Sequence, residues 1–75
     1  MRASAHLQKP NADVRELAAV GADFHGAGLA GADLRGADLR GADLGGAVLA
    51  GVKYDRETGW PVGFEPGAHG ARMEE

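Results

Sequence analysis

The chain lacks several features that would point to common functions. It has no cysteine among its 75 residues, which excludes disulfide bonds and thiolate metal sites. Its formal net charge of −3 argues against the basic surface that direct nucleic-acid binding needs. No apolar run is long enough to span a bilayer, and residues 1–13 lack the apolar stretch of a signal peptide. We therefore expect a cytoplasmic protein without a membrane partner.

Large side chains are also scarce, whereas glycine is abundant. The chain has 13 glycines but only two Phe, one Tyr and one Trp. Glycine costs backbone entropy on ordering, and few large side chains remain to offset that cost. A chain of this length forms one small domain with a modest core. Either part of it is disordered, or its fold requires small residues.

A phrase of five residues repeats without interruption from Gly21 to Asp55. The phrases read GADFH, GAGLA, GADLR, GADLR, GADLG, GAVLA and GVKYD. The first position is always glycine, the second is Ala or a final Val, and the fourth is Leu except for Phe24 and Tyr54 at the two ends. The third and fifth positions vary and carry the charges. The repeat is therefore the dominant structural signal.

A period of five fits neither an α-helix nor an ordinary strand. A helix would spread the apolar side chains around its surface and would lose roughly 1 kcal/mol for each glycine relative to alanine. A strand alternates every two residues, whereas here the next apolar pair begins after three. A short extended segment with two inward side chains, followed by a corner at glycine, does fit. A chain that turns a corner every five residues must coil.

These phrases closely resemble the pentapeptide-repeat family, whose consensus is A-(D/N)-L-x-x, often with Gly in the last position. The resemblance implies an all-β fold: a short, right-handed, four-sided parallel β-helix over residues 21–55. In this fold Leu fills the interior, the preceding Ala packs near the wall, and residue n lies over residue n + 20. Small Ala and Gly side chains would permit close stacking of adjacent coils.

The resemblance also assigns the inward and outward side chains. The expected core consists of the second and fourth positions: Ala22, Phe24, Ala27, Leu29, Ala32, Leu34, Ala37, Leu39, Ala42, Leu44, Ala47, Leu49, Val52 and Tyr54. The expected outward stacks are Asp23 over Asp43, Asp33 over Lys53, and Arg35 over Asp55. Opposite charges at that spacing attract weakly and like charges repel weakly.

Two segments precede the repeat. Residues 1–10 are predicted to be a disordered tail. Residues 11–20 have a candidate N-cap at Asn11 or Asp13, a run of helix formers, and Gly21 as a candidate C-cap, which favours a short α-helical cap. The alternative extends the repeat backward, because Val14 and Leu17 keep its phase.

Residues 56–75 break the period and are predicted to form a C-terminal capping segment and tail. The stretch YDRETGWPVGFEP resembles a tail of the type YD-x-x-T-x-WP-x-GFDP found on many pentapeptide-repeat proteins, with Glu65 in place of Asp. A solenoid end needs a cover because its unpaired backbone is a template for aggregation. Trp60, Val62 and Phe64 are candidates for a lid, or for a homodimer contact between the ends of two copies.

No residue pattern supports catalysis or cofactor binding. The string GAGLAG satisfies G-x-G-x-x-G, but its outer glycines belong to the five-residue period, and no helix is expected after it. Asp23, His25 and Asp43 could approach a metal, yet solvated surface is the expectation. Ser4 and Thr58 lack a recognisable base. We predict no catalytic, metal or cofactor site.

The remaining candidate is the charged outer face. Its residues are Asp33, Arg35, Asp38, Arg40 and Asp43. The leading hypothesis is a non-enzymatic structural or protein-interaction module with an unidentified protein partner, either standing alone or left from a longer solenoid. The alternative, which the family resemblance suggests, is a DNA-mimicking ligand of a type II topoisomerase such as gyrase. The interspersed arginines and the short rod weigh against it.

Overall fold

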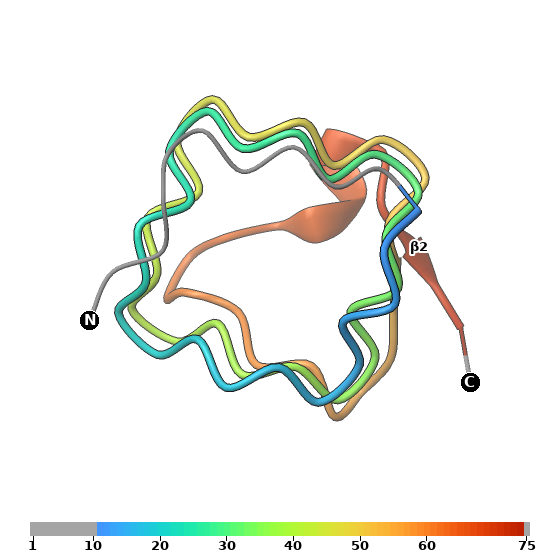
Figure 1. Ribbon diagram of the computed structural model, residues 1–75, viewed down its shortest axis with the longest axis horizontal. Helices are drawn as coiled ribbons and strands as arrows, with labels where there is room; N and C mark the ends of the chain where they lie inside the picture. The colour runs from blue at the N-terminus through green and yellow to red at the C-terminus, as the bar shows by residue number, and fades with distance from the viewer. Residues whose placement is uncertain (1–10, 75) are drawn as a thin grey trace.

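The chain winds into a coil whose successive turns lie almost on top of one another in a view along the axis (Figure 1). The computed structural model describes residues 11–74, so the predicted tail over residues 1–10 lies outside the described residues. A turn follows every five residues. The first-position glycines from Gly21 to Gly51 have φ between 69° and 73°, a left-handed conformation that glycine adopts without strain. Glycine therefore makes the corners.

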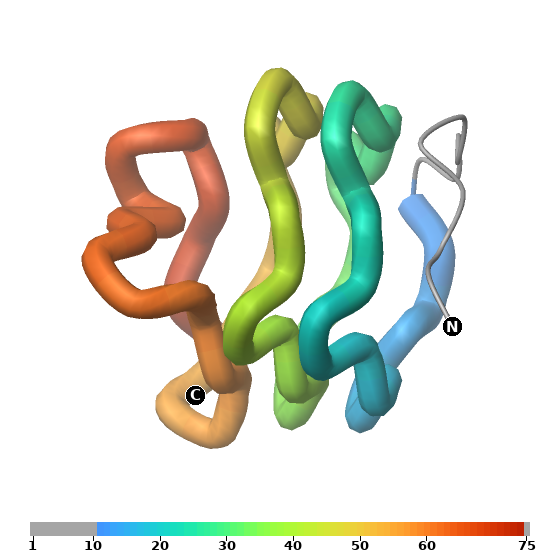
Figure 2. The backbone as a smooth tube through the Cα atoms, turned by 90° about the vertical axis from the view of Figure 1, so that its left-hand side faces the viewer, coloured from blue at the N-terminus to red at the C-terminus, as the bar shows by residue number. Residues whose placement is uncertain are grey.

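Parallel β-bridges join the third positions of successive coils. The bridged pairs within the coils are Asp13 with Asp33, Ala18 with Asp38, Asp23 with Asp43, Gly28 with Val48, and Asp33 with Lys53. Two hydrogen bonds hold each pair: the Asp43 N–H donates to the Ala22 carbonyl at 2.9 Å, and the Asp43 carbonyl accepts from the Phe24 N–H at 2.8 Å. Figure 2 shows the coils side by side along the axis. The bridges confirm the predicted stacking of residue n on residue n + 20, and the fold is a β-helix.

The prediction of a helical cap over residues 11–20 is wrong. The segment forms two sides of the first coil, because Asp13 bridges Asp33 and Ala18 bridges Asp38. Asn11 and Glu16 take the corner positions with φ of 60° and 62°. Pairing with the next coil therefore overrides the local helix propensity, and two side chains other than glycine accept the left-handed conformation.

The interior is filled by the second and fourth positions. Twelve of the fourteen expected core residues are buried: Ala22, Phe24, Ala27, Leu29, Ala32, Leu34, Ala37, Leu39, Ala42, Leu44, Leu49 and Val52. Ala47 and Tyr54 are half-buried instead. The core also reaches into the first coil, where Ala19 is buried and Ala12, Val14 and Leu17 pack against the core.

The C-terminal segment continues the ladder on two sides of the coil only. Strand β1 (Lys53–Tyr54) pairs in parallel with strand β2 (Arg72–Met73), with Lys53 opposite Arg72. On the adjacent side, Gly59 bridges Asp38. Along the chain, the 3-10 helix η1 (Pro66–His69) lies between Gly59 and β2. Residues 11–74 contain no α-helix.

Aromatic rings cover this end of the core. The Trp60 ring stands edge-on to Tyr54 at 5.5 Å between centroids and stacks on Phe64 at 5.2 Å, and Phe64 stacks on His69 at 4.7 Å. Trp60 and Phe64 pack against the core of their own chain, whereas Val62 is fully exposed. The sequence left two roles open for these residues, a lid and a homodimer contact. Trp60 and Phe64 make the contacts expected of a lid. Self-association through these residues stays a prediction.

Candidate functional site

The outward face carries a recurring pair of charged side chains. In three repeats the fifth-position arginine folds back onto the third-position aspartate: Asp13 with Arg15, Asp33 with Arg35, and Asp38 with Arg40. Arg35 donates from Nε to Asp33 Oδ1 at 2.9 Å and from Nη2 to Asp33 Oδ2 at 2.6 Å. Such bidentate pairs are stronger and more directional than single charge contacts.

The corner geometry brings each pair together. Asp33 Oδ1 also accepts the backbone N–H of Arg35 at 3.2 Å, and Asp38 accepts that of Arg40 at 3.2 Å. An aspartate that bonds the backbone two residues ahead favours a turn, and the same turn aims the arginine back at the carboxylate. The third-position aspartates therefore shape the corners as well as the charge of the surface.

These contacts lower the pKa values of the carboxylates. The hydrogen bond from the Arg35 guanidinium is the largest influence on Asp33 and lowers its pKa to about 2, with Arg15 adding to the effect from the neighbouring coil at 3.8 Å. The pKa of Asp38 is lowered in the same way by Arg40, and that of Asp13 by Arg15. The paired carboxylates therefore stay ionised and engaged at neutral pH.

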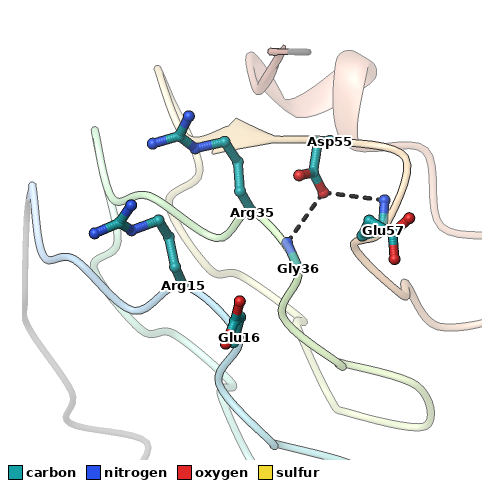
Figure 3. Close-up of a pocket in the computed structure, with 6 residues that line it drawn as sticks. All are labelled: Arg15, Glu16, Arg35, Gly36, Asp55 and Glu57. Atoms are coloured by element: carbon teal, nitrogen blue, oxygen red, sulfur yellow. Dashed lines mark hydrogen bonds between the residues drawn. The ribbon is translucent and has the colours of Figure 1, made fainter.

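A shallow depression of about 480 Å³ lies where two of these pairs meet the start of the C-terminal segment. It is lined by Arg15, Glu16, Arg35, Gly36, Asp55 and Glu57. Figure 3 shows the two arginine side chains running parallel and pointing away from the carboxylates of Asp55 and Glu57. The charged groups do not converge on one point, and the depression is open, so it does not provide the desolvated cleft that catalysis needs.

Asp55 instead fixes the path of the chain as it leaves the repeat. Asp55 Oδ1 accepts the N–H groups of Gly36 and Glu57, both at 3.0 Å. Burial raises the pKa of Asp55, but these hydrogen bonds and those with Thr58 outweigh burial and lower it. The carboxylate thus ties the C-terminal segment to a corner of the preceding coil.

Thr58 completes this junction, a role that was not predicted from the sequence. Thr58 is buried; its Oγ donates to the Leu34 carbonyl at 3.0 Å and accepts the Asp55 N–H at 3.1 Å. The hydroxyl therefore belongs to a structural joint, not to a nucleophile. The D-x-x-T spacing of the tail was the only signal that could have found it.

The predicted interaction residues lie on three consecutive sides of one coil: Asp33 and Arg35 on the first, Asp38 and Arg40 on the second, and Asp43 on the third. Asp33 with Arg35 and Asp38 with Arg40 form the closed pairs described above. Asp43 has no arginine two residues on; it accepts the Gly45 N–H at 2.9 Å, and His25 Nδ1 lies 3.8 Å from its Oδ1.

The metal and nucleotide motifs do not assemble into sites. Within residues 11–74 no three His, Asp or Glu side chains form a group that could hold a metal ion. Gly28, the central glycine of GAGLAG, occupies a third position and bridges Val48. In this part of the chain no helix is long and apolar enough to cross a membrane.

Comparison with known proteins identifies the repeat. A family model described as pentapeptide repeats matches residues 20–53, in 8 copies. The fold is similar to the crystal structure of a pentapeptide repeat protein from Nostoc Pcc 7120, with a TM-score of 0.50 and 24% sequence identity over 93% of this chain and 87% of that chain. No curated protein matches the chain.

Proposed function

We propose that the chain is a non-enzymatic structural or protein-interaction module of the pentapeptide-repeat type, because the pentapeptide-repeat model matches residues 20–53. Its β-helix would be right-handed and four-sided, and its function would be to present an ordered outer surface to a protein partner. The candidate surface consists of Asp33, Arg35, Asp38, Arg40 and Asp43.

One observation carries this proposal: the outward charged side chains are held in place, although the core does not need them. Arg40 is 71% exposed, yet it makes two hydrogen bonds to Asp38 at 2.8 and 2.7 Å. A preorganised polar side chain loses less entropy when a partner binds it. The repeated pairs therefore offer a rigid, patterned surface at low ordering cost.

The same pairing weighs against the topoisomerase alternative. A DNA mimic needs dense charge of one sign. Here Asp33 and Asp38 each face their own arginine, so much of the negative field is cancelled locally. We expect no inhibition of gyrase supercoiling at micromolar protein; inhibition that disappears in the Asp33→Asn, Asp38→Asn double variant would promote the mimicry hypothesis instead.

The proposal is tested by exchanging the two members of a pair. The Asp38→Arg, Arg40→Asp double variant keeps the net charge and the composition but reverses the surface pattern. A partner captured from host lysate by the wild-type chain should be lost with this variant. The matched control exchanges Arg56 and Glu57, two exposed residues outside the candidate surface, and should retain the partner. Equal capture by all three chains would show that the partner binds elsewhere.

A further inference from the structure

The Lys and Arg residues of the described chain divide into paired and unpaired side chains. They are Arg15, Arg35, Arg40, Lys53, Arg56 and Arg72. The first three fold back onto the aspartate two residues earlier, and Arg56 also has an interaction partner. Within residues 11–74, the Lys53 ammonium and the Arg72 guanidinium form no ion pair and no hydrogen bond. We call these two groups the cation pair.

The strand pairing at the end of the coil holds the cation pair together. Strands β1 and β2 pair in parallel with Lys53 directly opposite Arg72, beside the right-hand wall of the coil (Figure 1). Residues in register on neighbouring strands point to the same face, and both residues are exposed. Neighbouring strands lie about 4.8 Å apart, so the two positive charges repel each other.

The outward charge of this wall changes sign along the axis of the coil. Its third positions are Asp13 and Asp33 on the first two coils, followed by Lys53 and Arg72. Asp33 lies under Lys53 but is already engaged, because both of its carboxylate oxygens accept hydrogen bonds from Arg35. The coil beneath the cation pair therefore leaves its charge uncompensated.

The acidic side chains that follow the cation pair along the chain do not neutralise it either. Asp55 Oδ1 accepts the N–H groups of Gly36 and Glu57, both at 3.0 Å, and so belongs to the junction with the C-terminal segment. Glu74 is half-buried and forms no ion pair with Arg72. The cation pair is thus a local positive site on a chain whose formal net charge is −3.

We propose that the cation pair binds acidic side chains in an extended segment of a partner protein. Clusters of basic side chains are an established means of recognising acidic motifs, and hydrogen bonds between ionised groups are stronger than neutral ones. A carboxylate placed over the two strands would also remove the repulsion between Lys53 and Arg72. The site lies outside the candidate surface named above, so it does not rest on the proposed function.

The surroundings of the cation pair limit the partner segment to a short acidic motif. Residues two apart in an extended segment share a face and lie about 6.7 Å apart, a spacing that the long side chains of Lys53 and Arg72 can span. Beyond Lys53 the wall offers only the closed pair of Asp33 and Arg35. A nucleic acid or another long polyanion would meet the carboxylates of Asp55 and Glu74. The expected motif is therefore two acidic residues separated by one residue and flanked by neutral ones.

The experiment titrates the full chain, labelled with 15N, with the synthetic peptide acetyl-GSESEGS-amide at low ionic strength. We expect saturable shifts of the Lys53 and Arg72 amide signals and of Arg72 Nε, with Arg40 Nε unchanged. The peptide acetyl-GSQSQGS-amide should bind roughly tenfold more weakly, because both ion pairs are lost. Lys53→Gln and Arg72→Gln should each weaken binding of the acidic peptide about two- to fivefold, whereas the control Arg40→Gln should bind it like wild type.

Thermal melts separate binding from a structural role of the same residues. Because like charges opposite each other destabilise paired strands, Lys53→Gln should raise the melting temperature at low ionic strength. The gain should shrink as salt screens the repulsion. A lower melting temperature in this variant would show that Lys53 serves the fold and would count against the proposal.

Three binding results would also overturn the proposal. The first is equal shifts at Arg40 Nε and Arg72 Nε, which would show unspecific attraction of the peptide. The second is equal binding of the glutamate and glutamine peptides. The third is tighter binding of inorganic phosphate or of a single-stranded oligonucleotide than of the acidic peptide, which would make phosphate the ligand.

Discussion

The joint at Thr58 gives the sharpest mutational prediction. Thr58→Val keeps the shape of the side chain but removes the hydroxyl, and with it the bonds to the Leu34 carbonyl and the Asp55 N–H. The Leu34 carbonyl keeps the Ala37 N–H as a donor at 3.0 Å, so only the Asp55 N–H is left unpaired. Two lost hydrogen bonds, one of which leaves a group unpaired at a site that is 8% exposed, should lower the free energy of unfolding by about 2 kcal/mol.

Urea denaturation followed by the fluorescence of Trp60, the single tryptophan, measures this loss at the segment that Thr58 positions. Thr58→Ser is the matched control: it keeps the hydroxyl and loses one methyl group, which should cost no more than about 1 kcal/mol. A Thr58→Val chain within about 0.5 kcal/mol of wild type, or a Thr58→Ser chain that loses as much as Thr58→Val, would refute the role of the hydroxyl.

Three further predictions concern the core, the charged pairs and the lid. Leu39→Ala, at a site 1% exposed, should lower the free energy of unfolding by roughly 2–5 kcal/mol. Arg40→Ala, at an exposed site, should lower it far less, and equal losses of the two variants in urea melts would contradict the inward and outward assignment. The pKa of Asp33 is about 2 in the folded chain, below the value of about 3.9 in an unfolded one. The stabilisation that ionised Asp33 gives to the folded chain is therefore full above pH ~4 and is lost as the pH falls toward 2. Between pH 4 and pH 2 the melting temperature of the Asp33→Asn variant should therefore fall less than that of the wild type. Identical plots of melting temperature against pH would count against the pairing of Asp33 with Arg35. Trp60→Ala should lower the melting temperature equally at every protein concentration if the ring acts as a lid, whereas a loss that changes with dilution would support self-association through Trp60.

The repeat allowed much of the fold to be predicted, because each position has one physical role. Glycine at the corners and Leu at the fourth position determine the coil, and the coil determines which outward residues stack. Asp23 over Asp43 and Asp33 over Lys53 follow from the period together with the four-sided coil that the family resemblance implies. The pairing of Asp33 with Arg35 within one repeat was not predicted, because it depends on the turn between them.

The flanking segments could not be predicted in the same way. Residues 11–20 lack corner glycines, so local propensity favoured a helix, yet Asn11 and Glu16 adopt the left-handed conformation once the segment pairs with the next coil. Thr58 has no period to reveal it, and its role depends on the Leu34 carbonyl, 24 residues away.

The most direct test of the β-helix is whether residues 11–20 form part of the coil. NMR measurements of nuclear Overhauser effects on the full chain would show this. The coil predicts contacts between the amide protons and neighbouring backbone protons of Asp13 and Asp33, and of Ala18 and Asp38, with no helical pattern in residues 11–20. Successive amide–amide contacts of a helix through residues 11–20, with none across to Asp33 and Asp38, would contradict it.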